Sequence, residues 1–301
     1  MTRTITVGLD GSPESRAAAE WAAREAQLRG LPVRILQVWE PVPDPTSQAP
    51  LLGAETRRRW SAKIPRHAAE GLRLRHPGVD VTADQLTGRP SEVLSDAAKD
   101  AELLVLGSRG LSGIGGFLVG SVGSAVVAHT ECPVILVRAG EQATDEHETD
   151  AAGSPSAATR YRPVVLGLDV DHLDASMIDF ACDEAVRRDT GLRVVHGWSL
   201  PPYYLDGPTT DLERYDEVAH WHASALGEAL HAWRQKYPSL DVVEEFRTGS
   251  PTGLLIDASR TASLVVVGRR IRRRPFGGHI GPVTHAVLHH ATAPVAVVAH
   301  D

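Results

Sequence analysis

Residues 5–26 read ITVGLDGSPESRAAAEWAAREA, and this stretch joins a short strand pattern to a strong helix start. The β-branched and apolar residues at its beginning predict a buried strand that ends near Asp10. Ser12-Pro13-Glu14 then supplies an N-cap residue, a proline at the first helical position and an acid in the first turn. Alanines at i+4 spacing from Ala18 onward give the helix a small apolar face. The stretch therefore predicts a strand followed directly by a helix.

Three blocks of this sequence occur twice, in the same order, at an offset of about 160 residues. The paired blocks are residues 5–26 and 163–185, residues 33–43 and 192–202, and residues 87–107 and 248–268. Each copy ends in an apolar run led by a proline, at Pro133–Val137 and Pro294–Val298. This tandem repeat indicates two domains of one fold, which a length of 301 residues also favours.

The segment between the copies, residues 139–160, has Ala, Thr, Ser, Gly and acidic residues without apolar periodicity, which is typical of a solvated linker. We expect a first domain over residues 1–139, a linker over 140–160 and a second domain over 161–301. Short β-branched runs alternate with Ala-rich stretches in each copy, which predicts βαβ units around a parallel sheet. Five strands are expected per copy, in the first near Ile5, Val33, Val79, Leu103 and Val134.

Residues 107–124, GSRGLSGIGGFLVGSVGS, follow the expected fourth strand and lead into a helix that starts near Ser121. A glycine-rich turn before a helix favours anions, because glycines let the backbone approach phosphate oxygens and the helix start presents N–H groups and a positive dipole end. Ser121 and Ser124 can add hydroxyl donors. A flexible loop before a capped helix is the alternative interpretation of the glycine count.

Two common nucleotide-binding motifs are absent: there is no G-x-x-x-x-G-K-[ST], and no G-x-G-x-x-G directly after the first strand. These absences argue against a P-loop hydrolase and a dinucleotide dehydrogenase. The segment instead matches G-x2-G-x9-G-[ST] through Gly107, Gly110, Gly120 and Ser121. This pattern resembles the ATP-binding signature of the universal stress proteins. The resemblance covers both copies, including VGLDGS at the first strand, G-x-P before the third helix and CPVILV at the last strand.

The resemblance implies an α/β fold of two tandem Rossmann-like domains of the adenine nucleotide alpha hydrolase-like type. Each domain would be an open five-stranded parallel sheet of order 3-2-1-4-5 with helices on both faces. Ligands of such sheets bind at the carboxyl ends of the strands where the strand order reverses, here between strands one and four. Asp10 and Gly107 end these two strands, so they would form opposite walls of one crevice.

The resemblance also implies that ATP, with or without Mg²⁺, binds in this crevice of the first domain. Asp10 would contact the adenosine, the Val38 backbone would face the adenine edge, and the glycine segment would hold ribose and phosphates, with Arg109 adding charge. Asp10 could instead be a solvated turn carboxylate, and Val38 an ordinary buried strand residue. The expected binding residues are Gly8, Leu9, Asp10, Val38, Gly107, Arg109, Gly110, Gly120, Ser121, Val122, Gly123 and Ser124.

The function implied by the resemblance is that of a nucleotide-dependent sensor or regulator in a stress response. No nucleophile with a neighbouring base is recognisable, so we expect no catalytic residues and at most a weak ATPase. Two alternatives stay open, a slow ATPase or nucleotide-handling enzyme, and a structural dimerisation module without a ligand. The sequence does not identify a regulatory protein partner.

Composition narrows the partners further. The net charge of −7 gives no basic surface for nucleic acid, so neither DNA nor RNA is expected. Without a signal-peptide pattern or a long apolar run, we expect a cytoplasmic protein that does not enter membranes. Cys132 and Cys182 are predicted to be small buried hydrophobes. The histidine pairs at 220–222 and 289–290 lack further ligands at zinc spacing, so no metal site is expected.

The second copy departs from the motif. Ile271 stands where the second glycine belongs, and Pro282, which has neither hydroxyl nor N–H, replaces the serine. Val170 follows Asp169 where the first copy has a glycine. Ile271 would be strained if this position required a left-handed backbone. We expect this domain to bind ATP weakly or not at all. The alternative is that Arg269, Arg270 and Arg272 rebuild the site by charge. The run 269–274 is otherwise expected to be a solvated loop.

Val134–Val137 and Val295–Val298 are predicted to be apolar edge strands, which would invite uncontrolled pairing if left open. In the resembled family the last strand commonly pairs with its counterpart across a two-fold axis. We therefore expect the two domains of one chain to pair through these strands, and chains could associate further into a homodimer. The Pro-rich residues 41–53 are expected beside the pocket mouth, as a lid or an irregular connection.

Overall fold

Strands and helices alternate throughout the computed structural model, which describes residues 3–41, 58, 60–110, 117–118, 120–198, 212–271 and 279–301. The first half consists of β1 (Thr4–Gly8), α1 (Pro13–Arg29), β2 (Val33–Trp39), α3 (Lys63–Arg75), β3 (Val81–Thr87), α4 (Pro90–Ala97), a 3₁₀ turn (Ala98–Asp100), β4 (Ala101–Gly110), β5 (Phe117–Leu118), α5 (Ser121–His129) and β6 (Val134–Arg138). The second half follows a 3₁₀ turn (Ala143–Glu146) and consists of β7 (Val164–Gly167), α6 (Ala175–Arg187), β8 (Leu192–Trp198), α7 (Leu212–Lys236), β9 (Val242–Thr248), α8 (Pro251–Ser259), β10 (Leu264–Arg270), α9 (Pro282–His290) and β11 (Val295–His300).

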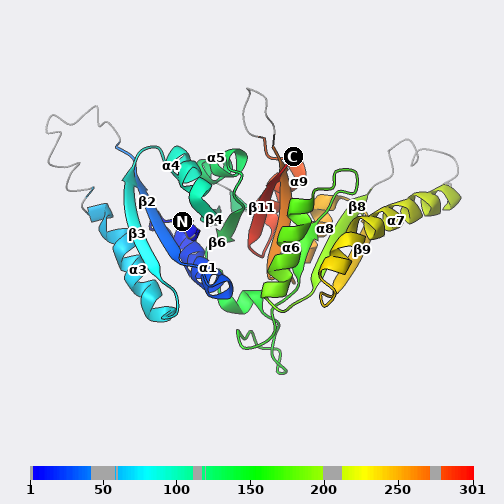
Figure 1. Cartoon of the computed structure of the whole chain (residues 1–301), viewed down its shortest axis with the longest axis horizontal. Helices are drawn as coiled ribbons and strands as arrows, with labels where there is room; N and C mark the ends of the chain where they lie inside the picture. The colour runs from blue at the N-terminus through cyan, green and yellow to red at the C-terminus, as the bar shows by residue number, and fades with distance from the viewer. Residues whose placement is uncertain are drawn as a thin grey trace.

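The main strands form one continuous sheet in the order β3-β2-β1-β4-β6-β11-β10-β7-β8-β9 (Figure 1). Each half is parallel and has the predicted order 3-2-1-4-5, so the predicted fold is confirmed. The halves meet where β6 and β11 pair antiparallel, with Val134 opposite Val297 and Leu136 opposite Val295. The expected pairing of the two halves through their last strands is therefore confirmed, and it leaves neither strand as an open edge.

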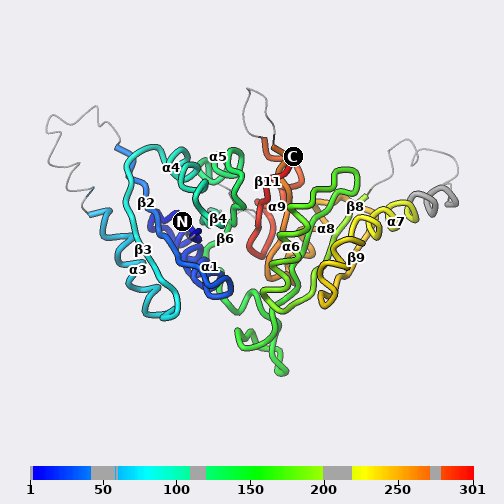
Figure 2. The backbone as a smooth tube through the Cα atoms, in the orientation of Figure 1, coloured from blue at the N-terminus to red at the C-terminus, as the bar shows by residue number. Residues whose placement is uncertain are grey.

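The sheet separates two apolar cores, and each core extends through both halves. Helices α1, α3, α6 and α7 contribute to one core, and α4, α5, α8 and α9 contribute to the other. Along β6, Ile135 and Val137 belong to the first core, while Val134 and Leu136 belong to the second, as the two-residue period of a strand requires. Figure 2 shows the resulting arrangement, with helices on both sides of the strands in each half.

Helix α1 begins as its sequence predicts and ends at a glycine. The Ser12 hydroxyl accepts a hydrogen bond from the Ser15 N–H at 3.2 Å, which caps the helix start. Gly30, at φ 64°, closes the helix in the left-handed conformation that glycine adopts without strain. Between these ends, small residues such as Ala18 and Ala22 are fully buried, so α1 packs closely on the sheet.

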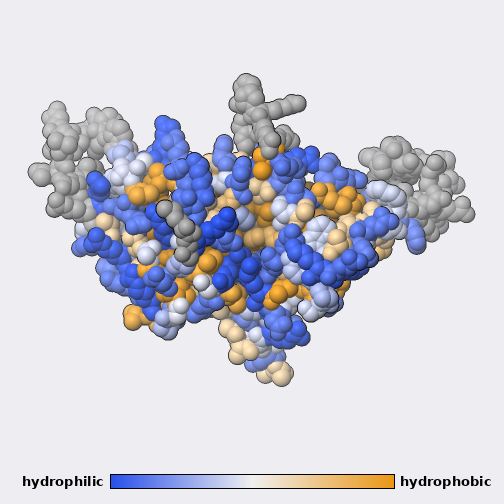
Figure 3. All heavy atoms as spheres, in the orientation of Figure 1, coloured by the Kyte–Doolittle hydropathy of each residue, from blue (hydrophilic) through white to orange (hydrophobic). Residues whose placement is uncertain are grey.

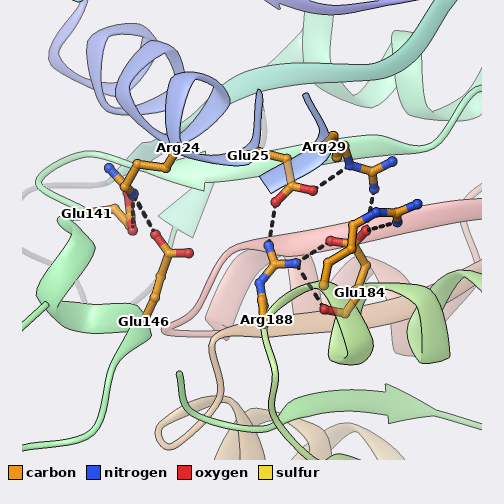
Figure 4. A network of polar contacts seen from close by, with 8 residues as sticks. Arg24, Glu25, Arg29, Glu141, Glu146, Glu184 and Arg188 are labelled. Carbon is orange, nitrogen blue, oxygen red and sulfur yellow. Dashed lines mark hydrogen bonds and ion pairs between the residues drawn. The ribbon is translucent and has the colours of Figure 1, made fainter. Parts of the chain in front are cut away.

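A ring of four charged side chains joins the halves on one face of the sheet (Figure 4). Glu25 binds Arg29 at 2.5 Å within α1 and Arg188 of the second half at 2.6 Å. Glu184 of α6 in turn binds Arg188 and Arg29. The repeat aligns Glu25 with Glu184 and Arg29 with Arg188, so the two cross-links are related by an approximate two-fold axis. All four side chains are at most 4% exposed, which makes the ring part of the interior.

The segment between the halves is bound to α1 through a second buried cluster. Arg24 contacts Glu141 at 2.7 Å and Glu146 at 2.6 Å, and both acidic side chains are 3–4% exposed (Figure 4). The prediction of a solvated linker is therefore wrong for this part of the segment. Sequence composition could not show it, because the partner of these acids lies more than a hundred residues away in the chain.

This cluster is expected to make stability depend on pH. Burial, together with the neighbouring Glu146, raises the pKa of Glu141 to about 8 despite the opposing effect of Arg24. Glu141 thus keeps its proton in the folded protein where the unfolded chain has lost it. The stabilisation that comes from protonated Glu141 is complete below pH 4.5 and is lost as pH rises to about 8. Over this range the free energy of unfolding falls by at most about 1.4 kcal/mol per pH unit.

Urea unfolding between pH 5 and 8 measures this effect. The E141Q variant, which mimics the protonated acid, is expected to lose less stability than the wild type as pH rises. The exposed Glu148 provides the control, because E148Q should follow the wild-type slope. Identical slopes for all three proteins would show that Glu141 is ionised in the folded state.

The visible surface in Figure 3 is mostly hydrophilic, with apolar side chains in small groups. Among the described residues, no helix is both long enough and apolar enough to span a membrane.

Candidate functional site

The first half contains a cavity of about 300 Å³ at the carboxyl ends of β1, β2 and β4. It lies where the strand order reverses between β1 and β4, which is the usual ligand position in sheets of this kind. Its described lining residues are Gly8, Leu9, Asp10, Ser12, Glu14, Ser15, Leu36, Val38, Pro90, Leu94, Leu106, Gly107 and Gly120–Gly123.

The turn from β1 into α1 forms one wall of this cavity. The Asp10 carboxylate accepts a hydrogen bond from the Ser12 N–H at 2.9 Å, which fixes its position at the strand end. Gly11 has φ 87°, a conformation that would strain any residue with a side chain. This tight turn brings the first turn of α1, including Glu14 and Ser15, to the cavity.

Gly107, at the facing wall, lies directly against the start of α1. A Cβ at this position would come within 2.5 Å of the Glu14 carbonyl carbon and 2.7 Å of the Ser15 nitrogen. Only glycine fits there, so β4 and the start of α1 can meet at the cavity.

The third wall is the start of α5. Gly120 is its N-cap, with φ −61° and ψ 161°, and contributes no side chain. Ser121, Val122 and Gly123 follow in the first turn and line the cavity. The start of α5 has no side-chain cap, so its N–H groups and dipole favour an anionic ligand in this space, whereas the N–H groups of Ser12 and Ser15 at the start of α1 are already bonded.

Most of the residues predicted for the site line this cavity: Gly8, Leu9, Asp10, Val38, Gly107, Gly120, Ser121, Val122 and Gly123. Ser124 is not among the described lining residues, and its N–H donates to the Gly120 carbonyl at 2.9 Å. Arg109 and Gly110 extend β4 and pair with β5, so the expected turn at Gly107–Gly110 is wrong. The Arg109 side chain, residues 111–116 and most of the Pro-rich segment 41–53 lie outside the described residues.

Sequence reasoning misses the polar residues that α1 contributes, namely Ser12, Glu14 and Ser15. A signal was present, because a helix cap placed directly after the first strand must stand at the carboxyl edge of the sheet. The cavity is also lined by Leu36, Pro90, Leu94 and Leu106. The sequence does not mark these residues, because apolar residues of the same types occur in buried strands and helices elsewhere in the chain.

The second half has a cavity of about 460 Å³ at the equivalent position. Ile271 does not adopt a left-handed backbone, so the strain considered for it is absent, and its N–H donates to the His300 carbonyl at 2.6 Å. Arg269 is 5% exposed and donates to the Thr130 carbonyl of the first half, so the arginine run is not simply a solvated loop. Residues 272–274 of that run lie outside the described residues.

The two cysteines are free, Cys182 buried and Cys132 partly so, as predicted for small hydrophobes. Burial raises the pKa of both thiols to about 12, so neither forms the reactive thiolate at neutral pH. In the part of the chain that the structure describes, no three His, Cys, Asp or Glu residues are placed to hold a metal ion.

The fold and the cavities define a class of protein: a tandem α/β chain with a ligand-sized space at the switch point of each half. The chain belongs to the universal stress protein family, whose model matches residues 1–138 and 160–299.

Relatives and solved structures agree with this assignment. A universal stress protein of Mycolicibacterium smegmatis is 30% identical over 98% of this chain and 96% of its own length. One of Mycobacterium tuberculosis is 30% identical over 97% of this chain and 96% of its own. The crystal structure of a universal stress protein from Archaeoglobus fulgidus covers both chains completely with a TM-score of 0.71 at 15% sequence identity, which shows the shared fold.

Proposed function

We propose that the first half binds ATP in its cavity and that the chain acts as a nucleotide-dependent regulator in a stress response. The observation that supports this most is that one cavity joins Asp10, Gly107 and the start of α5 at the switch point of the sheet. Leu36, Val38 and Leu94 give its inner part an apolar surface suited to adenine. The first turn of α5 provides N–H groups for the phosphates.

Binding without turnover fits the chemistry of this cavity. Its charged side chains, among the described lining residues, are Asp10 and Glu14, which can accept hydrogen bonds from ribose hydroxyls or complete the ligands of a Mg²⁺ ion held by the phosphates. No histidine or thiol lines the described part of it as a nucleophile or base.

Calorimetric titration of the full chain with ATP is expected to give one tight site per chain. In the second half, Pro282 supplies neither the N–H nor the hydroxyl that Ser121 supplies in the first. Two lost hydrogen bonds to a charged phosphate, at about 1.5–3 kcal/mol each, weaken affinity on the order of a hundredfold or more. Two sites of comparable affinity would contradict this expectation.

Mass spectrometry of the nucleotide retained by the purified protein separates the alternatives. Intact ATP supports the regulator, whereas ADP formed from added ATP would support a slow ATPase. A protein that retains no nucleotide and takes up no ATP would support a structural module.

A further inference from the structure

The cavity of the second half has an apolar floor. Leu168, Met177, Val195, Leu255 and Val267 line it, and each is at most 5% exposed. A space of about 460 Å³ over such a floor can take the apolar body of a small molecule.

The mouth of this cavity is basic. Arg270, His172 and His279 are exposed there, and His300 is half-buried. Asp169 is the acid among them, and it already accepts a hydrogen bond from His172 at 2.9 Å. The described lining of the first cavity differs in kind, since its charged side chains are the acids Asp10 and Glu14.

The inner wall also differs between the halves. In the first half the backbone of α1 rests on Gly107, but in the second half the side chains of Met177 and His300 converge on the equivalent Gly268. The Thr284 hydroxyl in the first turn of α9 is bonded to the Gly268 carbonyl at 2.7 Å. Because Pro282 has no N–H, the start of α9 offers fewer donors than that of α5, while Arg270 at the mouth supplies a positive charge and the histidines supply ring N–H donors.

We propose that this cavity binds a small organic anion other than ATP, with an apolar body on the floor and a single anionic head at Arg270, His279 and His300. A guanidinium and imidazoles recognise a compact phosphate or carboxylate through charge-assisted hydrogen bonds. A single head suits this site because the anion contacts come from side chains around the rim rather than from a row of backbone N–H groups.

The proposal is tested with three probes that share the naphthalene ring system: 1-naphthyl phosphate, 1-naphthoate and the uncharged 1-naphthol. They are titrated into the full-length G120V variant, whose first cavity is obstructed, so that any binding reports on the second half. At least one of the two anions is expected to bind at least tenfold more tightly than 1-naphthol. The stronger of the two anions identifies the head as phosphate or carboxylate.

Two further variants in the same background locate the binding. R270Q is expected to weaken the favoured anion at least tenfold, and a valine at Gly281, where a Cβ meets nothing within 4 Å, should obstruct the cavity without disturbing the fold. R260Q alters an exposed arginine outside the cavity and should change nothing. The proposal would be overturned if 1-naphthol bound as tightly as the anions or if neither anion bound. It would also be overturned if the Gly281→Val and R270Q substitutions left anion binding unchanged. ATP binding by the wild type is measured separately, so its failure would leave this result standing.

Discussion

Replacing Arg188 by methionine is expected to lower the free energy of unfolding by about 3–5 kcal/mol, as measured by urea denaturation. Arg188 is fully buried and holds Glu25 of the first half and Glu184 of the second at the same time. The guanidiniums of Arg188 and Arg29 lower the pKa of Glu25 although its burial acts in the opposite direction, so this carboxylate is ionised in the folded protein. Removing Arg188 leaves Glu25 and Glu184 with Arg29 as their one buried arginine, beside the partly exposed Arg187 at Glu184.

Arg187 provides a matched control, because it contacts the same Glu184 carboxylate at 3.2 Å from a position that is 33% exposed. The R187M variant should therefore lose no more than about 1 kcal/mol. Replacing all four members of the ring by leucine and methionine should cost less than R188M alone, because no buried charge is then left unpaired. Equal effects of R188M and R187M would mean that the ring contributes nothing beyond a surface ion pair.

The ring lies between two helices, α1 and α6, each of which also reaches one of the two cavities. Helix α1 runs from the first cavity, at Ser12 and Glu14, to Glu25 and Arg29. Helix α6 carries Met177 at the second cavity and Glu184 at the ring. One helix therefore leads from each cavity to the shared interface between the halves.

The repeat made the fold predictable. Strand and helix patterns recurred in register, which predicted two parallel α/β units, and the resemblance to the universal stress proteins implied the strand order and the pairing of β6 with β11. The buried ring was not predictable, because Glu and Arg at i+4 spacing, as in Glu25 and Arg29, are typical of exposed helix faces. Only the meeting of the halves places these charges in the interior.

The candidate site was predictable where it depends on glycine spacing, since Gly107 and Gly120 both line the cavity. It was not predictable where a residue type allows several conformations. Gly110 continues a strand instead of a turn, and Ile271 joins the end of β10 to β11 without strain. The basic mouth of the second cavity was also hidden, because its members come from separate elements of that half.

Replacing Gly120 by valine is expected to weaken ATP binding on the order of a hundredfold while the fold survives. Gly120 has φ −61° and ψ 161°, which any residue adopts, so the substitution introduces no backbone strain. A side chain at this N-cap would occupy the space from which phosphates reach the N–H groups of Ser121 and Val122. Calorimetry with ATP measures the loss, and an unchanged unfolding midpoint in urea verifies the fold.

The tandem repeat supplies the control for this prediction. Gly281 is the N-cap of α9 with φ −62° and ψ 156°, nearly the same conformation as Gly120. If ATP binds in the first half, Gly281→Val should leave its affinity within about twofold of the wild type, since the two cavities are separate. The reverse result, with ATP lost only on substitution of Gly281, would move the nucleotide to the second half, where the basic mouth would then hold its phosphates. Equal losses in both variants would indicate two sites of similar affinity, and Pro282 would then not be the obstacle that its missing N–H and hydroxyl imply.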